Sequence, residues 1–153
     1  MELKEWLGVE LDRARVRILE NDIPCVFCRN GQIVREGIGT GVGPLISAWE
    51  TEPELLRGTV IVDKIVGKAA AMLAVLGGTA GVYGLTMSEA ARDYLAAHGV
   101  PYGYDLCIEH IINRTGTGLC PMEQTVLTIE TPEEGYLALK ETMKRLREQT
   151  RDE

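Results

Sequence analysis

The chain has 153 residues, of which 45% are hydrophobic and 25% are charged. This length and composition predict one globular domain, residues 1–153, with a single sizeable core. A formal net charge of −7 argues against nucleic acid as a partner, because non-specific binding to it needs a basic surface. No apolar run approaches the roughly 18 residues of a membrane span, and the charged N-terminus is unlike a signal peptide. We therefore expect a cytoplasmic protein, without a membrane partner, whose four cysteines are reduced.

Apolar residues at helical spacing open the chain and predict one amphipathic helix that ends before Asn21. They are Leu3, Leu7, Leu11, Ala14 and Ile18. Two strand-like runs then flank Asn30-Gly31, a dipeptide that favours the positive φ angles of a tight turn, so residues 25–36 are predicted to form a β-hairpin. The glycine-rich stretch at 37–44 matches neither the Rossmann nor the Walker spacing. Its role stays open between a structural turn and a phosphate-binding loop.

After Gly58 the pattern alternates between strands and helices. Strands are predicted at 59–62, 79–85 and 102–107, with helices at 64–76 and 89–98, the second one capped by Ser88. This alternation implies right-handed crossovers and a largely parallel sheet, to which the hairpin adds an antiparallel edge. The sequence therefore predicts an α/β fold with a mixed sheet of about five strands. A capping box at 131–134 begins a final helix.

Three charged residues stand where the strand at 59–62 meets the next helix. Asp63 is predicted to be the N-cap of that helix. Lys64 and Lys68 are four residues apart, so they would share one helix face at the carboxyl edge of the sheet, where open α/β sheets bind ligands. Two interpretations remain open for the lysines. They are either solvated surface residues with apolar stems or two cations directed at an anionic ligand.

The stretch "IINRTGTGLCPMEQ", residues 111–124, has the highest density of reactive and ligand-binding residue types. Pro121 suits the first position of a helix, which makes Cys120 its N-cap and lets Glu123 reach back to the backbone N–H of Cys120. A thiol at that position faces the positive end of the helix dipole, which lowers a thiol's pKa. Cys120 is therefore a candidate nucleophile, with Glu123 or His110 as its assistant and Lys68 stabilising negative charge.

The residues just before Cys120 favour an anion site. Gly116 and Gly118 allow the backbone to turn its N–H groups toward an anion, and Arg114 adds a fixed positive charge beside Asn113. The alternative is a structural loop with a capping cysteine.

The cysteines and histidines do not predict a metal site. Cys25 and Cys28 lie three apart on a strand and would point to opposite faces of the sheet. Cys107, His110 and Cys120 could supply three ligands, but no Pro-Cys-x-x-Cys motif follows on a helix, as zinc deaminases require. We expect no metal and no cofactor.

Three motifs of the chain resemble a bacterial and archaeal family known as domain of unknown function 1893. They are "VDKIVGKAAAML", "YGLTMSEAA" and "HIINRTGTGLCPMEQTV", and the resemblance extends from about Cys25 to Lys140. It implies a cytidine deaminase-like fold, a three-layer α/β/α sandwich. The helix starts that hold zinc in true deaminases correspond here to "DKIVGKAAA" and "TMSEAARDYL", which contain neither cysteine nor histidine. The resemblance therefore implies a pocket without zinc, and so without the activated water of deamination. That pocket would be lined by Asp63, Lys64, Lys68, Thr86 and Ser88.

Three hypotheses for function follow. The first is a zinc-free deaminase-like domain that binds a nucleotide or another phosphorylated small molecule. The second is an enzyme, a transferase or hydrolase, that uses Cys120 as its nucleophile. The third is a non-catalytic regulatory or assembly domain that uses the pocket as a sensor or an interface. Independently of these hypotheses, we expect a homo-oligomer. The sequence leaves open whether the protein is an enzyme.

Overall fold

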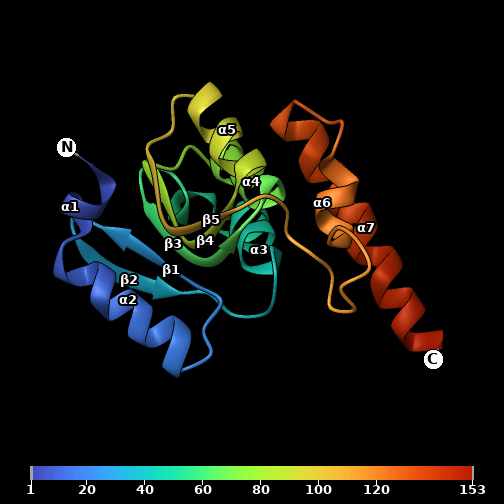
Figure 1. The fold of residues 1–153 in the computed structure, drawn as a ribbon, viewed down its shortest axis with the longest axis horizontal. Coiled ribbons are helices and arrows are strands. Elements are labelled where there is room, and N and C mark those ends of the chain that lie inside the picture. Colours follow the sequence, from blue (N-terminus) through green and yellow to red (C-terminus); the bar gives the residue numbers. More distant parts are fainter. Residues whose placement is uncertain (1, 153) are drawn as a thin grey trace.

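A computed structural model describes residues 2–152 and shows an α/β fold built around one mixed sheet (Figure 1). In chain order, the helices and strands are α1 (Leu3–Leu7), α2 (Val9–Glu20), β1 (Cys25–Arg29), β2 (Gln32–Glu36), α3 (Gly43–Thr51), the 3-10 helix η1 (Pro53–Leu55), β3 (Val60–Val66), α4 (Lys68–Gly77), β4 (Gly81–Ser88), α5 (Glu89–Ala97), β5 (Tyr102–Ile108), α6 (Pro121–Val126) and α7 (Pro132–Asp152). The α/β class is confirmed. None of the helices within residues 2–152 is both long enough and apolar enough to cross a membrane.

The five strands lie in the order β2-β1-β3-β4-β5. β3, β4 and β5 are parallel neighbours, while β1 runs antiparallel to both β2 and β3. Asn30 and Gly31 both have positive φ angles, 54° and 74°, and they form the tight turn between β1 and β2. The predicted hairpin and the mixed sheet of five strands are confirmed.

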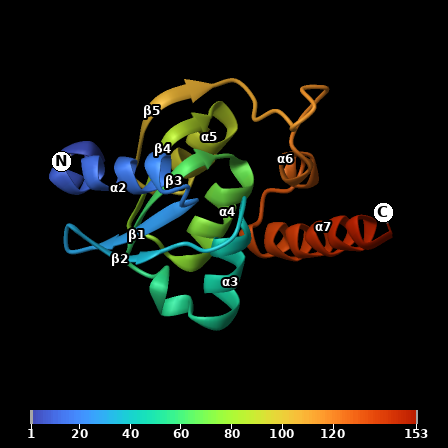
Figure 2. The ribbon, with the colours of Figure 1, turned by 90° about the horizontal axis from the view of Figure 1, so that it is seen from below.

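Helices pack against both faces of the sheet (Figure 2). α1 and α2 bury Leu7, Leu11 and Ile18 against one face, together with Tyr83 of β4. α3, α4 and α5 cover the other face, where the larger core lies, and α7 packs its buried Leu139 against that core from outside. In both views α6 and α7 lie on the far side of α4 from the sheet.

The first helix was predicted as one continuous segment, and this is wrong at one residue. Gly8 has a φ of 53°, a left-handed conformation that breaks the helix into α1 and α2. The apolar stripe is nevertheless buried as expected, because the break leaves Leu3 and Leu7 on the same side of the sheet as Leu11.

The boundary between β3 and α4 also differs from the prediction. β3 continues to Val66 and α4 begins only at Lys68, because the β-branched residues Ile65 and Val66 extend the parallel ladder and pair with Thr86 and Met87 of β4. Asp63 therefore lies inside a strand and is not a helix N-cap. The predicted arrangement of Lys64 and Lys68 on one helix face is wrong for the same reason, since residue 64 belongs to the strand.

Candidate functional site

At the carboxyl ends of β3 and β4, two of the five residues predicted for the zinc-free pocket come together. Lys68 at the start of α4 and Ser88 at the start of α5 line a small hollow with Glu109, His110 and Glu123. We call it the edge hollow. Its volume is about 30 Å³, which is room for about one water molecule. The edge hollow is therefore too small for a nucleotide. Ser88 acts there as predicted, because its Oγ accepts a hydrogen bond from the backbone N–H of Ala91 and caps α5.

Glu123 closes the edge hollow by capping α4. Its carboxylate accepts hydrogen bonds from the backbone N–H groups of Lys68, at 2.7 Å, and Ala69, at 3.0 Å. We call this pair of bonds the Glu123 cap. A helix N-terminus has N–H groups without partners and favours negative charge, so a carboxylate is well suited to it. The predicted bond from Glu123 back to Cys120 is absent, because the N–H of Cys120 donates to the carbonyl of Ile111 instead.

The protonation of Glu123 is set by opposing effects. Burial raises the pKa of its carboxyl above the ordinary value, while the N–H groups of Ala69 and Lys68 and the charge of Lys68 act in the other direction. Gly67, the residue before α4, provides the space that the carboxylate needs. A Cβ at position 67 would lie 2.4–2.5 Å from the carboxylate atoms of Glu123, so a larger residue there would displace them.

Lys68 is buried, and the interpretation of this residue as a solvated surface lysine is wrong. Its Nζ lies 3.4 Å from the carbonyl of Leu127 and 3.2 Å from a carboxylate oxygen of Glu130. It also lies 6.0 Å from the centre of the Tyr94 ring, within the range of a cation–π contact. Lys68 therefore ties α4 to the segment between α6 and α7.

The other three residues predicted for this site do not line the edge hollow. Asp63 is buried in β3, where its Oδ1 accepts the N–H of Ile65 at 3.2 Å. Burial raises the pKa of Asp63 to about 7, against the lowering effect of the N–H groups of Ile65 and Lys64. Lys64 is exposed on the same strand. Thr86 lies in β4, paired with Ile65 and Leu106 of the neighbouring strands.

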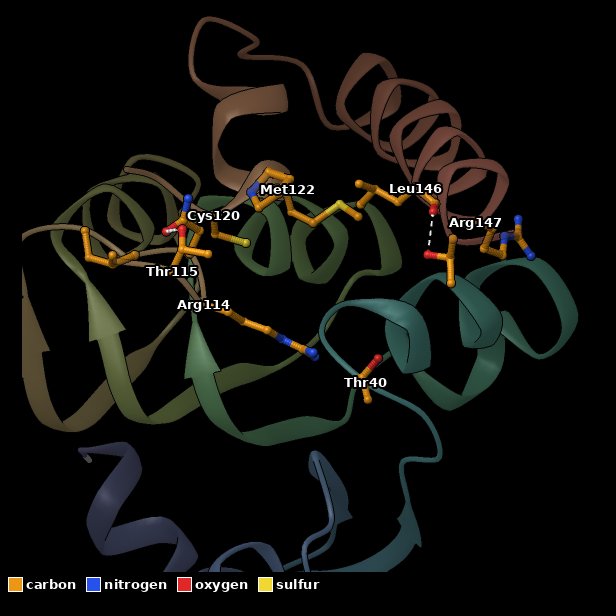
Figure 3. Close-up of a pocket in the computed structure, with 11 residues that line it drawn as sticks. Thr40, Arg114, Thr115, Cys120, Met122, Leu146 and Arg147 are labelled. Carbon is orange, nitrogen blue, oxygen red and sulfur yellow. Dashed lines mark hydrogen bonds between the residues drawn. The ribbon is translucent and has the colours of Figure 1, made fainter. Parts of the chain in front are cut away.

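A second and much larger hollow lies beside α6, as Figure 3 shows. Its volume is about 770 Å³, within the range of pockets that hold small molecules. We call it the arginine pocket. It is lined by Thr40, Ile112, Asn113, Arg114, Thr115, Cys120, Pro121, Met122, Leu146, Arg147 and Thr150.

Arg114 is the main polar feature of the arginine pocket. Its side chain extends from the loop before α6 toward Thr40 (Figure 3). Among the side chains of residues 2–150, its guanidinium has no partner in a hydrogen bond or an ion pair. Arg147, from α7, lies at the opposite end and is directed away from Cys120. An arginine that lines a pocket without a protein partner is suited to bind an anion.

Thr40 is not among the predicted site residues, although it belongs to the glycine-rich stretch at 37–44, for which a phosphate-binding loop was one of two interpretations. Gly39 and Gly41 on either side of it have φ angles of 113° and 56°, which favour glycine. This local conformation carries Thr40 to the rim of the pocket. Only the tertiary structure places it opposite Arg114.

The loop before α6 uses its polar groups internally. The Asn113 Oδ1 accepts hydrogen bonds from the N–H of Thr117 and from the Thr115 hydroxyl, and the N–H of Gly116 donates to the carbonyl of Asn113. Gly116 has a φ of 73°, so its glycine serves the turn. The expectation that the Gly116 N–H faces an anion is wrong, and Gly118 does not line the pocket. Asn113 and Arg114 both do.

Cys120 lines the arginine pocket, whereas Glu123 and His110 line the edge hollow. The predicted partners of the thiol therefore belong to a different hollow. Cys25 and Cys28 are buried in the cores on opposite faces of the sheet, as their spacing predicted. In the part of the chain whose side chains the structure describes, residues 2–150, no three His, Cys, Asp or Glu side chains gather as metal ligands. The starts of α4 and α5 hold no cysteine or histidine, so they do not fit the zinc of a deaminase.

The fold and these two hollows define an α/β protein with a small hollow at the sheet edge and a ligand-sized pocket outside it. The sequence model of the TM1506 family, described as domain of unknown function (DUF1893), matches residues 14–143. The chain therefore belongs to this family, and the predicted resemblance is confirmed. The crystal structure of a DUF1893 family protein, TM1506, from Thermotoga maritima has a similar fold, with a TM-score of 0.73 and 23% sequence identity. The similarity covers 88% of this chain and 90% of that one. The comparison with curated proteins gave no match.

Proposed function

We propose that the arginine pocket binds a small anionic molecule, either a nucleotide or another phosphorylated metabolite. The observation that carries this proposal is the guanidinium of Arg114, which lines a pocket of about 770 Å³ without a partner among the described side chains, those of residues 2–150. The chain carries a net charge of −7, so an anion gains little from the protein as a whole and depends on local cations. Arg114 supplies such a cation.

The rest of the lining supports a ligand with an apolar or aromatic part. Ile112, Pro121, Met122 and Leu146 contribute apolar surface, while Asn113 and Thr115, whose side chains bond each other within the loop, line the pocket near Arg114. A ligand with a phosphate at Arg114 and a base or similar group against the apolar side chains would match both the cationic and the apolar part of the lining. We include in the proposal that the strand and helix order from β3 to β5 is that of a cytidine deaminase-like fold without zinc. This part rests on fold-level analogy.

A second candidate function is a reaction at the Cys120 thiol. It is favoured by one observation, namely that Cys120 lines the same pocket as Arg114. A ligand held by the guanidinium would therefore lie near a potential nucleophile. If this function holds, iodoacetamide should inactivate the protein by labelling Cys120, and a bound ligand should slow that labelling.

Native mass spectrometry of freshly purified protein tests the proposal first, because a co-purified anion would appear as an added mass. Calorimetric titration with AMP, ADP, ATP and inorganic pyrophosphate then tests binding directly. Arg114→Ala should weaken binding of the tightest of these by about 10- to 150-fold, as expected for the loss of a charge-assisted contact. Arg57→Ala is the matched control. Arg57 is also exposed but lies just before β3, at the amino end of the sheet.

Equal affinities in Arg114→Ala and the wild type would contradict the proposed role of the pocket. Absence of both a co-purified mass and any binding among the four probes would contradict a nucleotide or pyrophosphate ligand.

A further inference from the structure

We infer that Glu123 is a positioning residue for the arginine pocket, because the Glu123 cap fixes α6 on α4 and with it the pocket wall at residues 120–122. The inference rests on the proposed function for the identity of the pocket's ligand. The contact itself can be tested without a ligand.

Helix α6 separates the two hollows. Cys120, Pro121 and Met122, at its amino end, line the arginine pocket. The next residue, Glu123, lines the edge hollow and reaches the first turn of α4. A movement of α6 away from α4 would therefore shift the wall of the arginine pocket. The two hollows share one short helix as their partition.

The position of α6 depends on its contacts, because a helix of six residues is too short to be stable alone. Val126 anchors its carboxyl end in the core, and the Thr125 hydroxyl bonds that of Thr142 in α7 at 2.8 Å. Near its amino end, the side chain of Gln124 bonds the carbonyl of Leu119 in the preceding loop. Among the side-chain hydrogen bonds described for residues 2–150, the Glu123 cap is the one that joins α6 to α4.

The Glu123 cap has the features of a strong contact. Two backbone N–H groups donate to one carboxylate, at the positive end of a ten-residue helix. The contact is also closely fitted, since the three atoms nearest to a Cβ at position 67 all belong to the Glu123 carboxylate. Gly67 has a φ of −102°, a conformation open to any residue. Its lack of a side chain is therefore required by the approach of Glu123 and not by the backbone.

A first experiment measures the pocket wall through Cys120. The rate of iodoacetamide labelling at Cys120 is divided by the rate at Cys107, which lies in β5 and is also partly exposed. Glu123→Gln should raise this ratio several-fold, because the amide keeps the size of the side chain but loses the charge and one of the two acceptors. Glu10→Gln is the matched control. Glu10 is a buried carboxylate that likewise accepts a backbone N–H, that of Ile33 at 2.9 Å, but it packs on the other face of the sheet.

A second experiment tests the close fit by a double-mutant cycle, read as the midpoint of thermal unfolding. Gly67→Ala should lower the midpoint in the wild type, because the new methyl group displaces the Glu123 carboxylate. In the Glu123→Ala background the same change should leave the midpoint unchanged or raise it, since the obstacle is gone and alanine restricts the unfolded chain. Equal lowering in both backgrounds would overturn the fit between the two residues.

A third measurement is the affinity for ATP. Glu123→Gln should weaken it and Glu10→Gln should not. If the labelling ratio is unchanged in Glu123→Gln, or if it rises while ATP affinity stays at the wild-type value, Glu123 does not position the pocket and the inference is wrong. If the wild type does not bind ATP, ATP is rejected as the ligand of the arginine pocket. The labelling ratio alone then decides whether the Glu123 cap holds the pocket wall.

Discussion

The protonation of Asp63 predicts how the stability of the protein depends on pH. Asp63 lies on the central part of β3, paired with Cys25 of β1 and Gly84 of β4, and 7% of the residue is exposed. Burial raises the pKa of its carboxyl from 3.8 to about 7, although the N–H groups of Ile65 and Lys64 favour the charged form. Desolvation is the larger effect. The folded protein therefore holds a neutral carboxyl at pH 5 to 6.

The sign of this pH dependence of stability follows from the pH at which Asp63 loses its proton in the unfolded and in the folded state. In the unfolded chain the carboxyl of Asp63 ionises near pH 3.8, whereas in the folded protein it stays protonated up to about pH 7. Unfolding between these values releases a proton, so the free energy of unfolding falls as pH rises through this window. The slope is about 1.4 kcal/mol per pH unit, and the loss by pH 7 approaches about 4 kcal/mol. Below pH 3.8 this contribution to stability is fully present.

The assay is urea unfolding of the wild type and Asp63→Asn at several pH values from 4 to 8. An asparagine stays neutral, and its Oδ1 can still accept the N–H of Ile65. The difference between the two free energies should therefore change by about 4 kcal/mol across the window, with the wild type losing stability toward neutral pH. Other groups such as Glu123 titrate in both variants and cancel in the difference. A difference that stays constant from pH 4 to 8 would show that Asp63 ionises normally and would refute the reasoning.

Three further changes test other parts of the fold by the same unfolding assay. Ser88→Ala removes the N-cap of α5 and should cost about 1 kcal/mol, while Ser88→Asp should retain most of the stability. Lys68→Ala should cost about 1–3 kcal/mol because the side chain is buried and bonded, whereas Lys64→Ala, at an exposed position, should stay within about 0.5 kcal/mol; equal effects would contradict the role of Lys68. Leu139→Ala should cost about 2–5 kcal/mol because Leu139 is fully buried. Leu137→Ala, on the exposed side of the same helix, should cost far less.

Local sequence patterns predicted the elements well and their ends less well. Asn30-Gly31 and Ser88 have roles that depend on neighbouring residues, so the hairpin and the cap of α5 could be predicted. The end of β3 could not, because Ile65 and Val66 suit either a strand or a buried helix, and pairing with β4 decides between them. Intrinsic strand propensity could not reveal that β4 continues to Ser88 and so provides partners for Ile65 and Val66.

The site was harder to predict because its contacts join distant parts of the chain. Glu123 lies three residues after Cys120, and this spacing favoured a capping box within one helix. In the structure its carboxylate instead accepts hydrogen bonds from Lys68 and Ala69, which lie 55 and 54 positions earlier in the chain. The sequence signal for this contact is indirect. Gly67 precedes α4 without a side chain that could cap it, so the helix requires an acceptor from elsewhere.

The Glu123 cap also bears on where a ligand can bind in this fold. Open α/β sheets present helix N-termini at the carboxyl edge of their parallel strands, and anionic ligands use them. In this chain α5 is capped by Ser88 and α4 by Glu123, so the first turns of both helices already have acceptors. An anion at α4 would have to displace a carboxyl group that already accepts two backbone N–H bonds. The guanidinium of Arg114, which has no partner among the side chains described up to residue 150, requires no such exchange. On electrostatic grounds an anionic ligand is therefore expected on the other side of α6, in the arginine pocket, and not at the sheet edge where the fold alone would place it.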